Sequence, residues 1–270
     1  MERYKELERA HYDAKAQQLP SHGLDLAGSA AIEEAVREPY IAFERSAGRY
    51  SFPGATVVDL GAGTGIHSLV ARDASIRIAA DISGEALRMA RERGRRADLV
   101  VTPLIADAEQ MPLADGCVDL VTSAGALYCF DFDNVCREIL RVLKPGGAWV
   151  FVDSWDANPL YRANRRIGRA RGRRTELALE NIPDAATLER LGQRFDVASV
   201  RYFGVFAFVA PVLRPLIGGS STARVVSKLD RLFPRLHRYA FKIVVEAIAP
   251  APRRDAAPAL PRTPSPAGAL

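Results

Sequence analysis

The sequence has few cysteines and no long apolar run. Its three cysteines, Cys117, Cys129 and Cys136, are spaced by 12 and 7 residues, which matches no zinc-site pattern and favours buried structural thiols in a reducing compartment. The longest nearly continuous apolar stretch, Tyr202 to Leu213, has 12 residues and is interrupted by Pro211. Such a stretch is too short to span a bilayer.

The N-terminal segment, residues 1–19, also lacks the apolar stretch of a secretory signal, because its sequence is charged and predicts a helix. We therefore expect a cytoplasmic protein. A hydrophobic content of 48% and a charged content of 26% are those of a globular chain, and 270 residues suffice for one α/β domain with additions. The net charge of +5 is too modest to indicate a nucleic-acid partner.

The glycine-rich stretch VVDLGAGTG, residues 57–65, is the feature around which the chain is organised. Apolar β-branched residues that run into glycines predict a buried strand ending in a tight turn. Glycine permits positive φ and, having no Cβ, lets a ligand lie against the backbone. Strand, glycine loop and helix start form the cofactor-binding end of a doubly wound sheet. Alone the stretch is weak evidence, because a dinucleotide site has the spacing GxGxxG.

A second predicted strand, 76–80, is followed by Asp81, which lies 22 residues after Asp59. A carboxylate at the end of this strand meets the ribose hydroxyls of a bound nucleotide, since it can accept two hydrogen bonds from neighbouring hydroxyls. NAD and S-adenosylmethionine both contain such a ribose. Asp81 therefore does not distinguish between them.

Two further stretches do distinguish them: ADAEQMPLADGCVDLV at 106–121 and ILRVLKPGGAWVFVD at 139–153. Together with the glycine loop and Asp81, they make the chain resemble the class I S-adenosylmethionine-dependent methyltransferases. The resemblance is strongest to the small-molecule branch that includes ubiquinone and menaquinone methyltransferases. It covers roughly residues 54–153, and four motifs in the family's order make it specific. It implies S-adenosylmethionine as cofactor, a small-molecule acceptor and no metal.

The alternation of strands and helices predicts an α/β fold with a mostly parallel, doubly wound sheet and helices on both faces. The resemblance implies seven strands, of which the last is antiparallel. We expect helices in 1–53 to cover the cofactor and acceptor site, a methyltransferase core at 54–249, and a disordered Pro/Ala-rich tail at 250–270. The expected strands are 55–59, 76–81, 99–105, 118–123, 148–153, 195–202 and 240–249, and the expected helices are 2–19, 30–50, 65–73, 84–93, 132–143 and 184–193.

The resemblance also implies a set of cofactor contacts, most of them at the carboxyl ends of parallel strands, where such sheets bind ligands. The glycine loop would hold the methionine part, and Asp59 would orient that loop and face the amino group. Asp81 would bind the ribose, Ile82 would pack on the adenine, and Asp107 would accept from the adenine amino group. The full predicted set is Tyr12, Asp59, Gly61, Ala62, Gly63, Gly65, Asp81, Ile82, Asp107, Ala108, Ser123 and Ala124.

Within this set, the Ala108 amide would meet an adenine ring nitrogen, and Ser123 and Ala124 would line the methionine side. Tyr12 belongs to the N-terminal sequence His11-Tyr12-Asp13. In the resembled family such a helix often covers the cofactor. A solvated helix packed by its tyrosines accounts for the same residues equally well.

The acceptor site is poorly marked in the sequence. Methylation of a hydroxyl benefits from a base that takes its proton. The candidates are His11, Tyr128, Asp153 and Asp156, although packing or a surface position is the commoner role for each. His67 is expected on the surface of a helix after the glycine loop. We favour O-methylation of a hydrophobic or acidic small molecule, in natural-product, glycan or lipid biosynthesis, over C- or N-methylation.

Two later segments have several interpretations. The segment 154–194 contains seven arginines between 162 and 174, which predict a solvated basic helix first, a site for an acidic acceptor second, and a nucleic-acid site last. The insertion 203–238 is apolar and then basic. We favour a roof over a hydrophobic acceptor pocket, followed by peripheral membrane contact and by a dimer contact. The sequence does not predict the oligomeric state.

Two other functions fit parts of the sequence. An NAD-dependent oxidoreductase would share Asp81, but the GxGxG spacing and Asp107 speak against it. A catalytically silent methyltransferase-like subunit would bind the cofactor and a partner protein. This second alternative stays open, because the sequence identifies no catalytic base.

Overall fold

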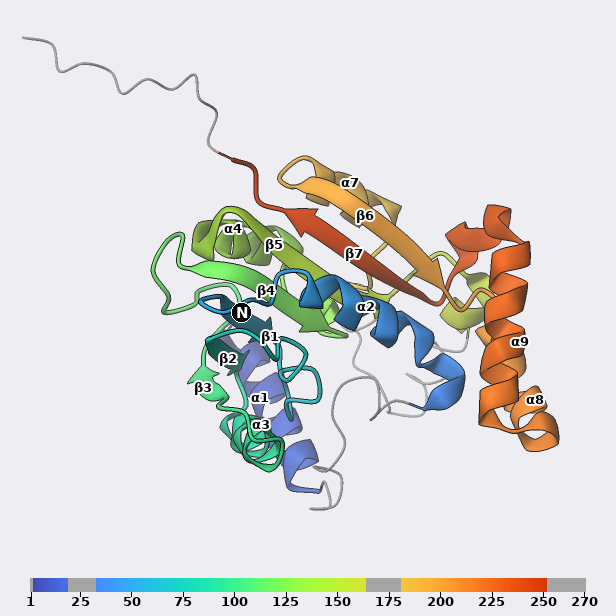
Figure 1. The fold of residues 1–270 in the computed structure, drawn as a ribbon, viewed down its shortest axis with the longest axis horizontal. Coiled ribbons are helices and arrows are strands. Elements are labelled where there is room, and N and C mark those ends of the chain that lie inside the picture. Colours follow the sequence, from blue (N-terminus) through green and yellow to red (C-terminus); the bar gives the residue numbers. More distant parts are fainter. Residues whose placement is uncertain (1, 19–32, 164–180, 252–270) are drawn as a thin grey trace, which may run out of the picture.

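The computed structural model describes residues 2–18, 33–163 and 181–251 (Figure 1). A seven-stranded sheet in the order β3-β2-β1-β4-β5-β7-β6 forms its centre. β7 pairs antiparallel with β5 and β6, whereas the other neighbouring strands pair in parallel. The strands are β1 Thr56–Leu60, β2 Ile76–Asp81, β3 Thr102–Ile105, β4 Val118–Ala124, β5 Leu143–Ser154, β6 Asp196–Phe203 and β7 Lys242–Ile248.

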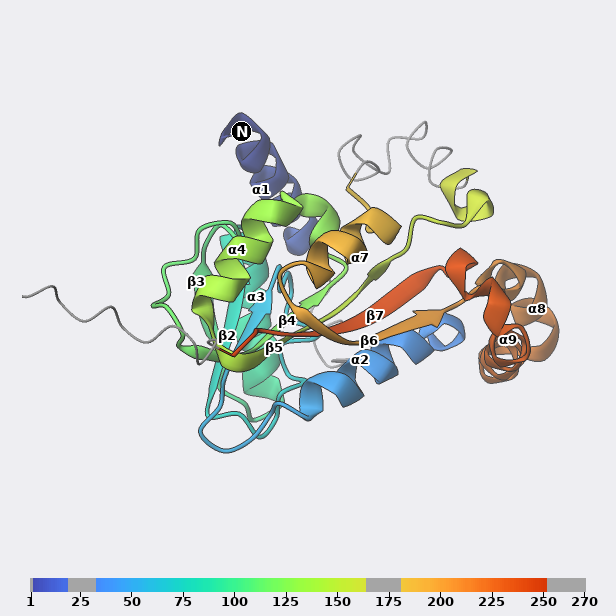
Figure 2. The same cartoon turned by 90° about the horizontal axis from the view of Figure 1, so that it is seen from above.

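Helices cover both faces of the sheet, with α2 on one face and α4 and α7 on the other (Figure 2). The α-helices are α1 Glu2–Gln17, α2 Glu38–Gly48, α3 Gly84–Arg96, α4 Phe132–Val142, α7 Ala185–Gly192, α8 Ala210–Ile217 and α9 Gly219–Leu232. The short 3-10 helices are η3 Glu34–Val36, η4 Leu127–Cys129, η5 Ala207–Val209 and η6 Pro234–Tyr239. No helix in the described ranges is both long and apolar enough to cross a membrane.

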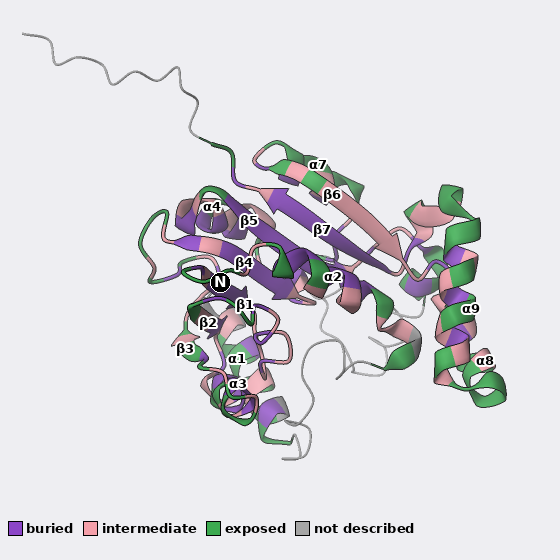
Figure 3. Cartoon of the chain, in the orientation of Figure 1, coloured by how far each residue is buried: buried purple, intermediate pink, exposed green. Residues whose placement is uncertain are grey.

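The central strands supply side chains to two separate cores because successive residues of a strand point to opposite faces. Val57 and Val150 pack in the core under α2, against Phe43 of that helix. Their neighbours Val58 and Phe151 pack in the core under α4 and α7. The inner strands are buried along most of their length (Figure 3), which explains why they are continuously apolar instead of alternating.

The predicted fold is confirmed: the sheet has seven strands and is mostly parallel, and the last strand of the chain, β7, is antiparallel and lies between β5 and the edge strand β6. Ser83 is the N-cap of α3, since its hydroxyl accepts from the Ala86 amide at 3.0 Å. β3 begins three residues later than expected, after Asp98 has taken a φ of 54°. Residues 164–180, with most of the arginine-rich run, and 252–270 of the predicted tail lie outside the described residues.

The predicted helix at 65–73 is wrong. The chain makes a series of tight turns between β1 and β2 instead. Side-chain hydrogen bonds hold this segment in place of the backbone hydrogen bonds of a helix. Ser68 donates to Asp59 at 2.6 Å, and Arg77 donates to the carbonyls of Ala71 and Arg72. Backbone carbonyls satisfied in this way gain little from forming a helix.

Candidate functional site

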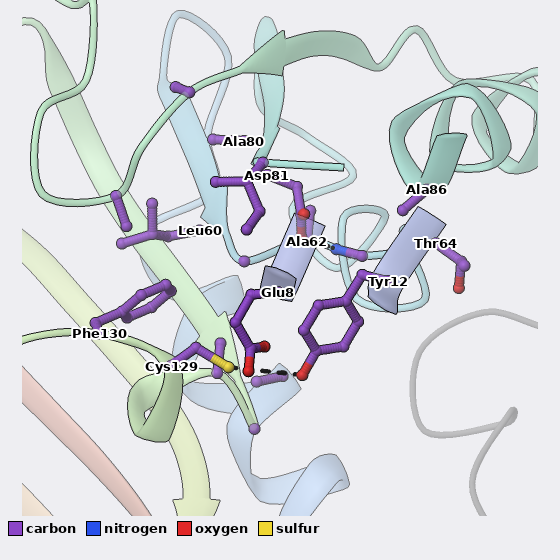
Figure 4. Close-up of a pocket in the computed structure, with 18 of the residues that line it drawn as sticks. Glu8, Tyr12, Leu60, Ala62, Thr64, Ala80, Asp81, Ala86, Cys129 and Phe130 are labelled. Atoms are coloured by element: carbon purple, nitrogen blue, oxygen red, sulfur yellow. Dashed lines mark hydrogen bonds between the residues drawn. The ribbon is translucent and has the colours of Figure 1, made fainter. Parts of the chain in front are cut away.

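A cavity of about 380 Å³ lies at the carboxyl ends of β1, β2, β3 and β4, with α1 as its roof (Figure 4). Parallel sheets of this kind bind ligands at this edge. The walls come from the loops that follow the four strands and from α1 and Tyr40 of α2. Nine of the twelve predicted cofactor residues line it: Tyr12, Gly61, Ala62, Gly63, Asp81, Ile82, Asp107, Ala108 and Ala124.

The three glycines of the loop all have positive φ, but they have different surroundings. A Cβ on Gly63 would meet nothing within 4 Å, so this stretch of backbone is open to the cavity. A Cβ on Gly65 would lie 2.6 Å from the Cβ of Ala90 in α3. Gly65 therefore allows the loop to pack closely against α3 and does not line the cavity.

Two other predicted residues, Asp59 and Ser123, also stay outside the cavity wall. The carboxylate of Asp59 is buried and accepts hydrogen bonds from Ser68 and Thr122 at 2.6 and 3.1 Å. Burial raises the pKa of Asp59 to about 6. Ser123 is buried within β4. We expected both side chains to contact the methionine part directly. Neither lines the cavity, so the structure does not support these contacts.

Asp81 lies in the cavity wall at the end of β2. Its carboxylate accepts from the backbone amides of Gly63 at 2.8 Å and Ser83 at 2.9 Å. Burial raises the pKa of Asp81, and these amide hydrogen bonds oppose that rise. The glycine loop and the predicted ribose acceptor are thus joined directly.

Asp107 lies beyond β3 and forms an ion pair with Lys5 of α1. The Lys5 ammonium also lies 3.3 Å from the carboxylate of Glu109. On the next turns of α1, Asp13 accepts from the Ser83 hydroxyl at 2.5 Å. These contacts hold α1 over the cavity, as expected if the N-terminal helix covers the cofactor site. His11, by contrast, is exposed and does not line the cavity.

Tyr12 points from α1 into the cavity, toward the segment after β4 (Figure 4). Its hydroxyl shares a hydrogen bond with the Tyr128 hydroxyl at 2.9 Å and lies 3.6 Å from the sulfur of Cys129. Burial raises the pKa of Tyr128 and of Cys129 to about 12 each, and raises the pKa of Tyr12 as well. All three groups therefore stay protonated at neutral pH, which argues against Tyr128 as a base.

His67 is not on a helix surface, as expected from the sequence, but in the cavity wall. Its ring stacks on Tyr40 at 5.2 Å and meets Phe43 edge-on at 5.6 Å. Burial, together with the charges of Lys242 and Arg93, lowers the pKa of His67 to about 4. Its Nδ1 is buried and has no hydrogen-bond partner among the described residues. A neutral imidazole with an unused nitrogen thus stands beside the cavity.

The remaining candidate bases do not reach the cavity. Asp153 is buried and accepts from the amides of Leu127 and Ser154, so it fixes the chain after β4. Asp156 forms an ion pair with Arg162. In the part of the chain that the structure describes, no residue of the insertion 203–238 lines the cavity, so the prediction that this insertion roofs it is wrong.

Sequence reasoning missed several lining residues. Lys5 and Glu8 come from α1, Tyr40 comes from α2, and Cys129 follows β4. Glu8 is a nearly buried carboxylate near Cys129. A charged residue on the buried side of a predicted surface helix is the signal that could have identified it.

A family model described as "Methyltransferase domain" matches residues 58–151, which span β1 to β5 and most of the cavity wall. The ubiquinone/menaquinone biosynthesis C-methyltransferase UbiE of Acidiphilium cryptum is 31% identical over 181 residues, which are 59% of this chain and 73% of that protein. The chain belongs to the class I S-adenosylmethionine-dependent methyltransferases. Its cofactor is S-adenosylmethionine.

Other relatives of this methyltransferase act on different acceptors. The malonyl-[acyl-carrier protein] O-methyltransferase of Methylococcus capsulatus is 40% identical over 128 residues, which are 46% of this chain and 45% of that one. The solved structure of geranyl diphosphate C-methyltransferase from Streptomyces coelicolor A3(2), with Mg2+, geranyl diphosphate and S-adenosyl-L-homocysteine, has a TM-score of 0.57. It is 18% identical and covers 79% of this chain and 78% of that chain. This likeness shows the shared fold.

Proposed function

We propose that the cavity under α1 binds S-adenosylmethionine and a small acceptor together, and that the acceptor is methylated on oxygen. S-adenosylmethionine supplies a methyl group on a positively charged sulfur, ready for in-line displacement. The work of the chain is then to hold the two reactants in line and to keep water out. The observation that carries the oxygen assignment is the neutral His67 ring beside the cavity.

The cofactor half of the cavity has the features that a nucleoside with a charged tail needs. The open backbone at Gly63 would receive the methionine part, and the Asp81 carboxylate would accept from the ribose hydroxyls. Ile82 offers an apolar face to the adenine, while Asp107 and the Ala108 amide match its amino group and a ring nitrogen. Asp81 suits the ribose of either nucleotide, so the GxGxG spacing of the glycine loop and the position of Asp107 after β3 are what disfavour NAD.

The acceptor half lies by inference where the wall is aromatic and carries the fewest charges, between Tyr40, His67 and Tyr128. An acceptor hydroxyl becomes strongly acidic as its oxygen gains the methyl group. A weak base is then sufficient, and His67 would take that proton on a ring nitrogen and pass it to water. A carboxylate acceptor, as in the O-methyltransferase relative, would need no base.

The test uses labelled S-adenosylmethionine and the full chain with a panel of phenols, alcohols and carboxylic acids, and with amines and activated carbon acids for comparison. We expect product only when an oxygen nucleophile is present. His67→Gln should lower kcat with hydroxyl acceptors at neutral pH, while KM for the cofactor stays unchanged. Raising the pH until the acceptor itself ionises should restore the rate. Methylation of carbon or nitrogen alone would overturn the assignment.

Binding alone separates the remaining alternatives. S-adenosylhomocysteine should raise the melting temperature, by an amount that grows with the logarithm of its concentration above Kd, and NADH should not. Stabilisation by S-adenosylhomocysteine without turnover of any acceptor would favour a silent methyltransferase-like subunit. Stabilisation by NADH instead would favour an oxidoreductase site.

A further inference from the structure

The insertion between β6 and β7 concentrates the exposed apolar surface of the molecule. It contributes α8 and α9, which pack against each other as a helical hairpin beside the β6–β7 side of the sheet (Figures 1 and 2), and whose described residues do not line the cavity. Thirteen large apolar side chains are exposed in the described residues, and seven of them lie between 208 and 233. Single exposed apolar residues are ordinary, but such a concentration marks a contact surface.

The first helix of the hairpin, α8, has an apolar outer side. Val212 and Leu216 are one turn apart, so they lie on the same face, and they are 66% and 74% exposed. Ile217 is also exposed, directly before Gly218, whose φ of 77° lets the chain turn into α9. The tip of the hairpin therefore carries apolar side chains toward solvent.

The second helix, α9, divides its exposed side into two stripes. Arg224, Lys228 and Arg231 recur at the helical spacing and are exposed, so they form a basic stripe. Val225 and Leu232, seven residues apart and also exposed, form an apolar stripe beside it. The opposite side, which includes Val226 and Asp230, is buried.

The hairpin and its flanks are strongly basic. Residues 205–241 contain six Lys or Arg and one acid, a balance of +5, while the remaining 31 basic and 31 acidic residues of the chain cancel. The single acid, Asp230, is buried and accepts from the amides of Gly204 and Phe206. Arg214 is paired with Glu33 at 2.7 Å. The basic stripe of α9 therefore has no acid of its own segment facing it.

We propose that the α8–α9 hairpin docks on an anionic lipid surface. An apolar stripe inserted between headgroups beside cations that meet lipid phosphates is the arrangement of an interfacial helix. Helices of 8 and 14 residues are too short to span a bilayer and suited to lie on one. A second copy of the chain would bring the same cations against each other, so the charge pattern favours the bilayer.

The test measures co-sedimentation of the full chain with vesicles of phosphatidylcholine alone and of phosphatidylcholine mixed with phosphatidylglycerol. We expect binding to the mixed vesicles that weakens as salt is added. Leu216→Gln should reduce binding about tenfold, through the loss of an inserted apolar group. Each of Arg224→Gln and Lys228→Gln should reduce it about fivefold, the equivalent of one cation near the surface.

The matched control is Val100→Gln, which alters a 79% exposed apolar residue outside the hairpin and should leave binding unchanged. Unchanged thermal unfolding midpoints would show that all variants fold. Equal binding to both vesicle types, or equal loss in the control, would overturn the proposal. So would a protein that ignores both vesicles but elutes as a dimer that Leu216→Gln separates, since that outcome assigns the face to a second copy. None of these readouts needs cofactor or methyl transfer.

Discussion

The backbone amide of Gly63 donates to the Asp81 carboxylate at 2.8 Å. One oxygen of the predicted ribose acceptor therefore also fixes the glycine loop that would carry the methionine part. The other oxygen accepts from Ser83 at 2.9 Å, at the start of α3. Cofactor recognition and loop geometry thus depend on the same side chain, and a substitution at Asp81 affects both.

We predict that Asp81→Ala weakens the affinity for S-adenosylhomocysteine by about 1–3 kcal/mol, because it removes charged hydrogen bonds and leaves the Gly63 amide without its partner. Asp81→Asn keeps an oxygen that can accept from Gly63 and should lose less. Titration calorimetry of the three proteins measures the difference. An unchanged affinity in the alanine variant would remove Asp81 from the site.

Asp107→Ala should weaken the same affinity less, by roughly 1 kcal/mol or below, because hydrogen bonds to a solvated group are worth little. The Asp107 side chain is 36% exposed, whereas Asp81 is largely buried. The same calorimetric series provides the comparison. A larger loss at Asp107 than at Asp81 would contradict the ranking.

Gly63→Ala and Gly65→Ala should separate binding from stability. At Gly63 a Cβ meets nothing within 4 Å, so we expect a strain of about 1–2 kcal/mol from the positive φ and a clear loss of cofactor affinity. At Gly65 the Cβ would lie 2.6 Å from the Cβ of Ala90, which should destabilise the fold further. Chemical denaturation and calorimetry of both variants test this, and equal stability would count against it.

His67→Phe should make the fold less sensitive to acid. The folded pKa of His67 is lowered from 6.5 to about 4, so the unfolded chain binds a proton first as the pH falls. Neutral His67 therefore contributes fully to stability above pH 6.5. As the pH falls from 6.5 to 4, the free energy of unfolding drops by about 3 kcal/mol, at roughly 1.4 kcal/mol per pH unit. Phenylalanine cannot titrate and keeps the stacking on Tyr40.

The measurement is the free energy of unfolding as a function of pH for the wild type and the variant. Asp59, whose pKa is raised to about 6, acts in the opposite direction, but it is present in both proteins and cancels in the difference. Parallel curves for wild type and His67→Phe would show that His67 titrates normally.

The sequence predicted the parts of the site that local pattern determines. Apolar runs ending at Asp59, Asp81 and Ser123 place strand ends within a residue of their true positions. Eight of the nine predicted cofactor residues that line the cavity lie at or just after the ends of β1, β2, β3 and β4, and Tyr12 comes from α1. Glycine spacing, by contrast, could not distinguish an open position such as Gly63 from a packed one such as Gly65, since that depends on Ala90.

Contacts between distant segments explain the remaining errors. His67 is buried because Tyr40 and Phe43 of α2 stack around it, and no local pattern links 67 to 40. Residues 65–73 form turns instead of the expected helix, because Ser68 and Arg77 bond this segment to β1 and β2. Helix propensities do not include such side-chain hydrogen bonds. The apolar character of the insertion 203–238 predicts a roof over the acceptor pocket, but its apolar side chains face solvent beside the β6–β7 side of the sheet.

The position of α1 as the roof of the cavity affects how the chain folds while it is being translated. Lys5 and Asp107 are 102 residues apart in the chain, and Tyr12 and Tyr128 are 116 apart, so α1 leaves the ribosome long before the partners that hold it over the cavity. A nascent chain that has not yet reached Phe130, the last residue of the cavity wall, has no closed pocket to offer. Ribosome-bound chains of increasing length could therefore be tested for binding of S-adenosylhomocysteine. The shortest chain that binds would show when α1 meets the segment after β4 and the pocket forms.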